Sequence, residues 1–227
     1  MISGTTRLVA LLGHPVAHSL SPRMQNAAFA SRALDIAYVA LDVPPDRFDE
    51  ALRGLAAAGF LGANVTAPHK FAAARLSESE LPSVNTLLFD GGSIRGCSTD
   101  GAVLAGRSFG RPAVIGDGGS ARAFAAALPG ARVYSRRGTW PPSTDDADLV
   151  VHATPVRDAL LFEPRRGQAV VDLPYPDSET ARAARAAGAE VLDGLDVLVA
   201  QGAASFELWT GVPAPVDVMR AAVASAG

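Results

Sequence analysis

The sequence predicts an α/β fold that consists of two α/β domains in succession. Short apolar runs alternate with longer stretches of helical periodicity almost from the first residue, which is typical of strands and helices that pack in layers. The alternation starts a second time at Ala113, where a glycine-rich turn follows the new strand directly. With 227 residues, of which 48% are hydrophobic, the chain is long enough for two domains and can bury a core.

The first domain is expected over residues 1–100. The apolar run Leu8–Leu12 predicts a buried strand, and Ser21-Pro22 predicts a helix to about Ala33, with Ser21 as its N-cap. The elements expected after it are a strand at Ala37–Leu41, a helix over Pro45–Ala58 closed by Gly59, a short strand at Ala63–Val65, and a hairpin of Thr86–Phe89 and Ile94–Cys97 joined by Asp90-Gly91-Gly92-Ser93.

The second domain is expected over residues 101–212. Its elements are a strand at Ala113–Ile115, a glycine-rich turn, a helix to Leu128, strands at Arg132–Ser135, Leu149–His152, Ala169–Leu173 and Glu190–Leu192, a helix over Ser178–Ala187, and a closing helix at about Val197–Trp209. A second closing helix is expected after it, at about Val216–Ala224. The order of strand, helix and strand predicts a parallel sheet with helices on its faces. We expect the C-terminal helix, at about residues 213–227, to pack back on the first domain.

The composition argues against several classes of function. The net charge of −3 and the lack of a basic block argue against nucleic acid as the main partner. The Leu8–Leu12 stretch is too short for a membrane span and no signal-peptide pattern follows it, so we expect a cytoplasmic protein without a membrane partner. The single cysteine, Cys97, excludes an internal disulfide and fits a reducing compartment. The four histidines lack the spacing of zinc sites, so no metal is expected.

The turn after Ala113–Ile115 has the composition of a phosphate-binding loop. It reads Gly116-Asp117-Gly118-Gly119-Ser120-Ala121-Arg122 and opens a helix. Glycines let the backbone N–H groups approach a phosphate, and a helix N-terminus favours an anion. The alternative is a plain turn between a strand and a helix.

The next strand favours NADP over NAD. An acidic residue at this corner would bond the ribose 2′-hydroxyl of NAD, whereas arginine accommodates a 2′-phosphate. This strand ends in Tyr134-Ser135-Arg136-Arg137, without an acid. Two guanidinium groups suit a phosphate there, and the alternative is a solvated basic turn.

Three segments of the first domain carry side chains suited to a polar substrate. Ser19 and Ser21 stand at the start of a helix, where they either bind a carboxylate or only cap the helix. The segment Asn64–Lys70 is expected to place Lys70 in the loop after a short strand, where it can donate or accept a proton. Asp100, in Thr99-Asp100, could pair with Lys70 around a substrate hydroxyl, although a surface charge is the alternative for either residue.

Read together, these segments resemble the shikimate dehydrogenase family over nearly the whole chain. The matching motifs, in the family's order, are H-S-x-S-P at His18–Pro22 with Asn26 after it, N-V-T-x-P-x-K at Asn64–Lys70, Val84-Asn85-Thr86-Leu87, Thr99-Asp100, G-x-G-G-x-A-R at Gly116–Arg122, and the tail Gln201-Gly202-Ala203-Ala204-Ser205-Phe206-Glu207-Leu208-Trp209-Thr210-Gly211. The resemblance implies an N-terminal substrate domain and a Rossmann-like NADP-binding domain with a cleft between them. It also implies the reversible NADPH-dependent reduction of 3-dehydroshikimate to shikimate, in aromatic amino acid biosynthesis.

The family pattern also implies roles for individual residues. Lys70 and Asp100 would form the catalytic pair. The substrate pocket would be lined by Ser19, Ser21, Asn64, Thr66, Asn85, Tyr175 and Gln201. The cofactor would be bound by Gly116, Gly118, Gly119, Ser120, Ala121, Ser135, Arg136, Arg137, Thr154, Pro155, Leu173 and Gly194.

The chain departs from the family pattern in several places. The family usually has Asn where Ser98, Ser135 and His152 stand, and apolar Val197-Leu198 replaces a Met that often follows Gly194. Asp117 is an unusual acid inside the glycine turn, where it would repel a pyrophosphate unless it points away. The chain is also short for the family, and the missing residues are expected between Lys70 and Asn85 and around 137–148. The second gap would shorten the wall beside the adenine ribose and weaken cofactor binding.

Alternatives remain open at this point. Lys70 could act as an acid and base or as a fixed positive charge. A quinate or aminoshikimate dehydrogenase fits the same motifs, and so does a ligand-binding relative without catalysis, although that relative would have no need of Lys70 and Asp100 together. Both a monomer and a homodimer are compatible with the sequence.

Overall fold

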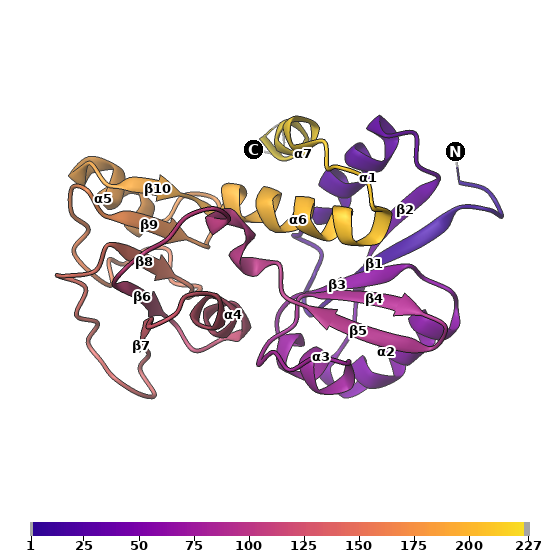
Figure 1. Ribbon diagram of the computed structural model, residues 1–227, viewed down its shortest axis with the longest axis horizontal. Coiled ribbons are helices and arrows are strands. Elements are labelled where there is room, and N and C mark those ends of the chain that lie inside the picture. Colours follow the sequence, from indigo (N-terminus) through magenta and orange to yellow (C-terminus); the bar gives the residue numbers. More distant parts are fainter. Residues whose placement is uncertain (1, 225–227) are drawn as a thin grey trace. The chain divides into compact units, whose positions relative to one another are not determined.

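The computed structural model describes residues 2–224 and has the α/β architecture that the sequence predicts (Figure 1). The chain divides into two compact units. Residues up to 99 and residues from 199 onward form the first unit, and residues 100–198 form the second. Each unit has a five-stranded sheet of its own.

The sheet of the first unit has the strand order β2-β1-β3-β4-β5. Its strands are β1 (Arg7–Gly13), β2 (Ile36–Asp42), β3 (Gly62–Val65), β4 (Thr86–Asp90) and β5 (Ser93–Cys97). β1 pairs in parallel with β2 and β3, whereas β3, β4 and β5 pair in antiparallel fashion. The predicted hairpin is therefore present, and it extends a parallel β/α arrangement by two strands.

Helices lie on both faces of this first sheet (Figure 1). They are α1 (Ser21–Ser31), the 3-10 helix η1 (Pro45–Arg47), α2 (Phe48–Ala57), α3 (Lys70–Leu76), part of α6 (Gly194–Thr210) and α7 (Val216–Ala224). On one face, Phe48 and Leu52 of α2 pack with Leu12 of β1 in a buried cluster. Because both faces are covered, β1 is a continuous buried apolar strand rather than an alternating one.

The sheet of the second unit is wholly parallel, with the strand order β10-β9-β8-β6-β7. Its elements are η2 (Asp100–Leu104), β6 (Pro112–Ile115), α4 (Gly119–Ala127), β7 (Arg132–Tyr134), β8 (Leu149–His152), β9 (Ala169–Asp172), α5 (Glu179–Ala187) and β10 (Glu190–Leu192). Val114 of β6 packs with Phe124 of α4 on one face, and Ile115 packs with Ala184 of α5 on the other. In this sheet β7 lies beside one edge of β6, and the next strand in the chain, β8, lies beside the opposite edge of β6. The direction in which strands are added therefore reverses between β6 and β8.

The structure corrects the expected end of the second domain. We placed residues 101–212 there, but the residues from Val199 onward belong to the first unit. The reason is the apolar face of α6, on which Phe206 stacks against Phe29 of α1 with ring centroids 5.2 Å apart. The indole N–H of Trp209 also donates a hydrogen bond of 3.0 Å to the carbonyl of Leu87 in β4. The expected C-terminal helix packs against α1, although residues 225–227 of the expected range lie outside the described part of the chain.

Two local expectations were wrong. Lys70 was expected in a loop, but it is the first residue of α3, a helix that the sequence analysis did not anticipate. Ser21 was expected as the N-cap of α1, but the N-cap is Leu20 and no side chain caps this helix. The side chain of Ser21 is hydrogen-bonded to Tyr38 instead.

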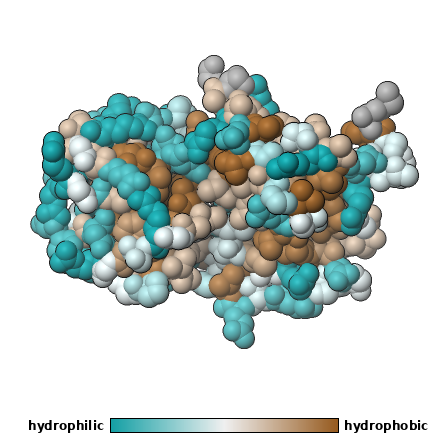
Figure 2. Space-filling model, turned by 45° about the horizontal axis from the view of Figure 1, so that its top comes forward, coloured by the Kyte–Doolittle hydropathy of each residue, from teal (hydrophilic) through white to brown (hydrophobic). Residues whose placement is uncertain are grey.

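The surface is mixed in character. On the face that Figure 2 shows, patches of hydrophobic residues lie between hydrophilic ones. None of the helices within residues 2–224 is long and apolar enough to cross a bilayer. In the same range, no group of three His, Cys, Asp or Glu side chains is arranged to hold a metal ion.

Candidate active site

The loops that follow β1 and β3 lie against each other at one edge of the first sheet. The backbone N–H of Thr66 donates to the carbonyl of Leu12 at 2.9 Å, and that of His14 donates to Ala67 at 3.0 Å. A Cβ on Gly13 would come within 2.4 Å of the Thr66 methyl carbon, so a larger residue at this position would force the Thr66 side chain to move. The two motifs that were predicted to bind substrate are thereby held at the carboxyl ends of neighbouring parallel strands.

The phenol of Tyr38 joins two of the predicted substrate residues. It donates a hydrogen bond of 2.8 Å to Oδ1 of Asn64, and it is hydrogen-bonded to the side chain of Ser21. Burial raises the pKa of Tyr38, so the phenol keeps its proton and remains a donor. Ser19 lies beside this group, because its Oγ accepts the backbone N–H of Ser21 at 3.2 Å. Tyr38 was missed by the sequence analysis.

A second set of buried amides and hydroxyls links β3 to α6. Asn64 donates from Nδ2 to the carbonyl of Asn85 at 3.1 Å and to Oγ of Ser205 at 3.0 Å. Asn85 donates from Nδ2 to Oγ1 of Thr99 at 3.0 Å and to Oε1 of Gln201 at 3.4 Å. Ser205 was not predicted as a site residue, although it follows Gln201 by one helical turn. Three of the predicted substrate residues therefore belong to one network within the first unit.

Lys70 is fixed at the start of α3 by its neighbours. Only 9% of the residue is exposed, and its carbonyl accepts the backbone N–H of Val84 at 3.1 Å. The preceding residue, His69, stacks on Phe48 with centroids 4.4 Å apart, and its Nε2 lies 2.7 Å from the carbonyl of Val43. Burial lowers the pKa of His69, so the ring is neutral at pH 7 and donates this hydrogen bond from Nε2. The packing thus positions an almost fully buried amine.

Asp100 follows the first unit's network directly in the chain. The backbone N–H of Thr99 donates to Oδ1 of Asn85 at 2.8 Å, which fixes the backbone that leads into Asp100. Asp100 is the first residue of η2 and the first residue of the second unit, and 6% of it is exposed. A buried carboxylate is expensive unless it is paired or hydrogen-bonded, so this position indicates a specific role rather than a surface charge.

The glycine turn after β6 passes close to the loop after β8 and leads into the uncapped start of a helix. Gly116 adopts a φ of +136°, and a Cβ there would lie 2.6 Å from the carbonyl oxygen of Ala153. Around Gly118 no atom would lie within 4 Å of an added Cβ, so the turn is open on that side. α4 begins at Gly119 without a side-chain cap, and Ser120 and Ala121 follow in its first turn. Its N-terminus suits the pyrophosphate of a dinucleotide.

Two arginines follow β7, the strand beside the glycine turn. Arg136 lies over the ring of Trp140, 5.7 Å from its centroid. Nη1 of Arg137 lies 3.6 Å from a carboxylate oxygen of Asp117, and the Arg137 side chain is 90% exposed. Ser135 closes the tight turn that carries both arginines, since its N–H donates to Thr139 at 3.1 Å. The acid in the glycine turn is therefore directed toward a guanidinium group.

The remaining predicted cofactor residues also follow strands of the second sheet. Thr154 and Pro155 come after β8, Leu173 comes directly after β9, and Gly194 comes after β10. A Cβ on Gly194 would lie 2.6 Å from the carbonyl oxygen of Leu173, so these two loops touch. Tyr175 belongs to this unit too, and burial raises its pKa. The predicted cofactor residues thus gather at the carboxyl edge of a parallel sheet, where dinucleotides bind.

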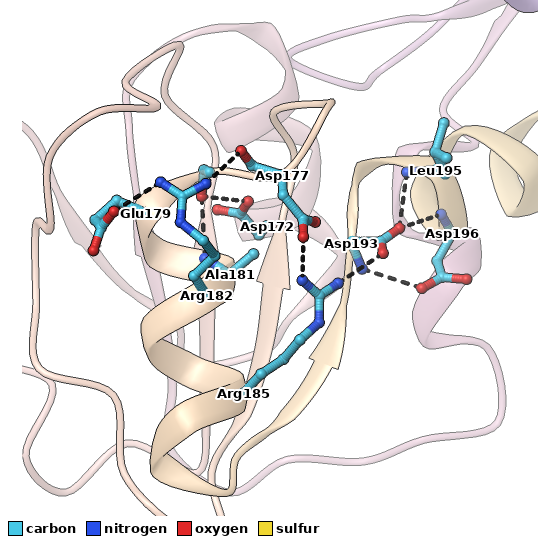
Figure 3. Close-up of polar contacts among 10 residues, drawn as sticks. Asp172, Asp177, Glu179, Ala181, Arg182, Arg185, Asp193, Leu195 and Asp196 are labelled. Carbon is cyan, nitrogen blue, oxygen red and sulfur yellow. Dashed lines mark hydrogen bonds and ion pairs between the residues drawn. The ribbon is translucent and has the colours of Figure 1, made fainter. Parts of the chain in front are cut away.

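Figure 3 shows how ion pairs tie two of these loops together. Arg185 of α5 pairs with Asp177 at 2.7 Å and with Asp193 at 2.9 Å. Oδ1 of Asp193 accepts the backbone N–H groups of Leu195 and Asp196, both at 3.1 Å, which caps the start of α6. The loop after β9 and the start of α6 are consequently fixed to each other.

Two family models match this chain. Residues 11–86 match the shikimate dehydrogenase substrate binding domain, and residues 194–224 match the shikimate 5′-dehydrogenase C-terminal domain. The shikimate dehydrogenase (NADP(+)) of Anaeromyxobacter dehalogenans strain 2CP-C is 41% identical over 278 aligned positions, which cover 100% of this chain and 99% of the relative. The shikimate dehydrogenase (NADP(+)) of Moorella thermoacetica is 38% identical, and the alignment covers 92% of that relative.

Solved structures of shikimate dehydrogenases are also similar to this chain. A shikimate dehydrogenase in complex with NADP+ has a TM-score of 0.90 at 28% identity, covering 100% of this chain and 97% of that chain. The Thermus thermophilus enzyme in complex with NADP(H) and shikimate has a TM-score of 0.84 at 33% identity, covering 97% of this chain and all of that chain. The alignment with the Anaeromyxobacter enzyme runs over 278 positions against 227 residues here, so this chain lacks segments that the relative has.

Proposed function

Because the chain belongs to the shikimate dehydrogenase family, we propose that it catalyses the reversible NADPH-dependent reduction of 3-dehydroshikimate to shikimate. The observation that carries this proposal is that two ionisable residues of the family motifs are both buried, Lys70 at the start of α3 in the first unit and Asp100 at the start of the second. In this family the reaction serves aromatic amino acid biosynthesis. We place it in the reducing cytoplasm, which the single cysteine fits.

We assign proton transfer to Lys70 and its orientation to Asp100. The lysine ammonium would donate a proton to the developing alkoxide in the reductive direction, or stabilise that charge until a proton arrives. Asp100 would hold the ammonium and a neighbouring substrate hydroxyl. Two hydrogen bonds support this assignment. The backbone N–H of Val84 donates to the carbonyl of Lys70, and the backbone N–H of Thr99, the residue before Asp100, donates to Oδ1 of Asn85. The adjacent residues 84 and 85 therefore fix the backbone at Lys70 and just before Asp100.

Substrate binding is assigned to polar side chains at the edge of the first sheet. Ser19 and Ser21 would bind the carboxylate, because Ser21 does not cap α1 and both hydroxyls stand at its start. Asn64, Thr66, Asn85 and Gln201 would bind ring hydroxyls, which are donors and acceptors as amides and hydroxyls are. Tyr175 remains a predicted substrate contact from the second unit. These groups match a small hydroxylated carboxylic acid in chemistry.

The cofactor site fits NADP. When bound, NADPH supplies the hydride that the reduction needs. Gly116, Gly118 and Gly119 would leave room for the pyrophosphate, and the start of α4 would bind it. Arg136 and Arg137 would bind the 2′-phosphate, with Ser135 shaping their turn.

A substrate and cofactor panel tests the proposed activity. Shikimate, quinate and an amino analogue of shikimate are each offered with NADP+ and with NAD+, and the absorbance of the reduced nicotinamide is followed. We expect the largest kcat/KM with shikimate and NADP+. A larger kcat/KM with quinate would reassign the chain to quinate dehydrogenases, and binding of NADP+ in calorimetry without turnover of any substrate would leave a ligand-binding relative.

The Lys70→Ala variant tests the assigned catalytic role. Loss of a general acid–base group typically lowers turnover about 100- to 10,000-fold. We expect that loss in kcat with a change in KM below about 5-fold, the mark of an interaction made in the transition state. Steady-state kinetics in both directions check it. Near-normal kcat in a folded variant would refute the role of Lys70.

A further inference from the structure

A buried series of polar side chains ends at the hydroxyl of Thr154. Nδ1 of His152 lies 2.6 Å from Oδ1 of Asp172, and Nε2 of the same ring lies 2.7 Å from Oγ1 of Thr154. The second carboxylate oxygen of Asp172 accepts the hydroxyl proton of Ser178 at 2.7 Å. His152 and Asp172 are 0% and 1% exposed and Ser178 is 0% exposed, so the hydrogen bonds among these three residues are shielded from solvent.

This arrangement follows from strand register and from a helix cap. His152 and Asp172 are the last residues of β8 and β9 and stand opposite each other in the parallel pairing. Ser178 is the N-cap of α5, and its Oγ accepts the backbone N–H of Ala181 at 3.1 Å. Figure 3 shows Asp172 beside the start of α5. A strand end and a helix N-terminus therefore hold the carboxylate that supports His152.

One tautomer of His152 gives every group in this series a partner. With the proton on Nδ1, the ring donates to Asp172, which also accepts from Ser178, and Nε2 accepts the Thr154 hydroxyl proton. Oγ1 of Thr154 also accepts the backbone N–H of Val156 at 3.2 Å. The only proton of the Thr154 hydroxyl is thus committed to His152, and what this oxygen has left to offer is an acceptor lone pair.

Thr154 stands where the second sheet reverses its strand order. It follows β8, and the residue before it, Ala153, donates its backbone N–H to Ile115 of β6 at 2.8 Å. The glycine turn begins at Gly116, whose hypothetical Cβ would lie 2.6 Å from the Ala153 carbonyl oxygen. In parallel sheets dinucleotides bind at this reversal point, so the Thr154 loop and the glycine turn flank the same binding position.

We propose that His152, supported by Asp172 and Ser178, is a positioning residue that holds the Thr154 hydroxyl as a hydrogen-bond acceptor for the amide N–H of the nicotinamide carboxamide. The inference rests on the proposed function, since it assumes that NADP binds at this edge. It also gives a role to the histidine that stands where the family usually has asparagine. An asparagine at residue 152 could satisfy Asp172, but its shorter side chain has no second nitrogen at the position of Nε2 to orient Thr154.

Binding of two cofactor forms to the full chain tests the proposal. Calorimetry compares NADP+ with its 3-acetylpyridine analogue, which lacks the carboxamide N–H groups. The variants are Thr154→Val, which removes the hydroxyl at nearly constant volume, Thr154→Ser, which keeps it, and His152→Asn. We expect Thr154→Val and His152→Asn to weaken NADP+ binding about 3- to 10-fold, the value of one neutral hydrogen bond, and to leave analogue binding within about 2-fold. Thr154→Ser should bind NADP+ like the unsubstituted chain.

The outcomes separate this inference from the proposed function. Equal weakening of NADP+ and analogue binding in Thr154→Val, or no weakening at all, would overturn the inference while NADP+ binding by the unsubstituted chain still supports the function. An unsubstituted chain that binds neither ligand would overturn both. Binding of adenosine 2′,5′-bisphosphate serves as the folding control, because it contains the adenine half alone and should be the same in all variants. If His152→Asn fails this control, the two Thr154 variants decide the outcome.

Discussion

The buried hydroxyl of Tyr38 positions side chains that are assigned to substrate binding, without being assigned a substrate contact itself. It donates to Asn64 and is bonded to Ser21, two residues assigned to substrate binding. The Tyr38→Phe variant leaves Oδ1 of the buried Asn64 without this donor, so we expect a loss of about 1–3 kcal/mol in the free energy of unfolding. We also expect KM for shikimate to rise several-fold, since the Asn64 amide is no longer held. Denaturant unfolding and steady-state kinetics measure the two effects.

Tyr134→Phe provides a matched control for that variant. The Tyr134 hydroxyl donates to the carbonyl of Ser143 at 2.8 Å within the second unit. Its removal should also lower stability, but it should leave KM for shikimate unchanged. A similar rise in KM in both variants would mean that Tyr38 acts only through stability.

Asp117 and Arg137 give a second prediction at the residue scale. The carboxylate competes with a 2′-phosphate for the guanidinium group 3.6 Å away, and it also repels the phosphates of the cofactor. The pair is exposed and therefore weak, so Asp117→Asn should improve NADP+ affinity only about 2- to 5-fold. The gain should shrink as salt is added, because exposed charges are screened.

Calorimetry at low and high ionic strength checks this expectation. Asp90→Asn, at the exposed end of β4, removes the same charge from the hairpin and serves as the control for net charge. Tighter NADP+ binding by both variants would point to a general charge effect. Weaker binding by Asp117→Asn would show that the carboxylate orients Arg137 productively.

Sequence motifs predicted most of these residues but not their partners. Ser21, Asn64 and Lys70 carry recognisable spacing, and the structure places all three near one edge of the first sheet. Tyr38 and Ser205 carry no local signal, because they meet Asn64 from 26 and 141 positions away in the chain. Such long-range polar pairing depends on sheet register and helix packing, which a single sequence does not encode in any short pattern.

At the scale of elements, Gly62 shows how closely β3, β4 and α6 approach. A Cβ on Gly62 would lie 2.1 Å from the Leu87 carbonyl oxygen and 2.5 Å from the indole nitrogen of Trp209. Backbone cannot move aside easily, so Gly62→Ala must separate the strands or break the Trp209 hydrogen bond. We expect a loss of at least about 2 kcal/mol in the free energy of unfolding, measured by denaturant titration.

Gly54→Ala is the matched control for that substitution. Gly54 lies within α2, and nothing would lie within 4 Å of its Cβ. Alanine there should raise stability by roughly 0.5–1 kcal/mol, because glycine is a poor helix former. If Gly62→Ala were as mild as Gly54→Ala, the close packing of α6 on the first sheet would be wrong.

Element types were more predictable than element ends. The buried strands and the hairpin follow from apolar runs and turn residues, and the structure has strands at each of these positions. α3 was missed because it has only seven residues and no side-chain cap at its start. Residues 135–148 join β7 to β8 without any helix, where a parallel crossover usually contains one. This shortened connection lies in one of the two regions where the sequence predicted missing residues.

For the molecule as a whole, the main surprise is the division inside α6. A helix that starts at Gly194 in the second unit continues as part of the first from Val199 onward. The sequence could not predict this change, because the apolar pattern of the helix continues without a break across residue 198. Its physical basis lies in contacts with Phe29 and Leu87, which are far away in sequence.

Hydrogen–deuterium exchange with each ligand alone tests this division. NADP+ should protect residues 116–122 and 154–156 of the second unit, whereas shikimate should protect residues 19–21 and 64–70 of the first. Ligand binding stabilises the state it binds, so slowed exchange spreads through the elements that unfold with the site. Within α6, residues 194–198 should therefore respond to NADP+ and residues 199–210 to shikimate. Residues 90–93 at the hairpin turn should respond to neither ligand. If all of α6 followed NADP+ as one block, its second half would belong energetically to the cofactor-binding unit, and the boundary after residue 198 would have no functional meaning.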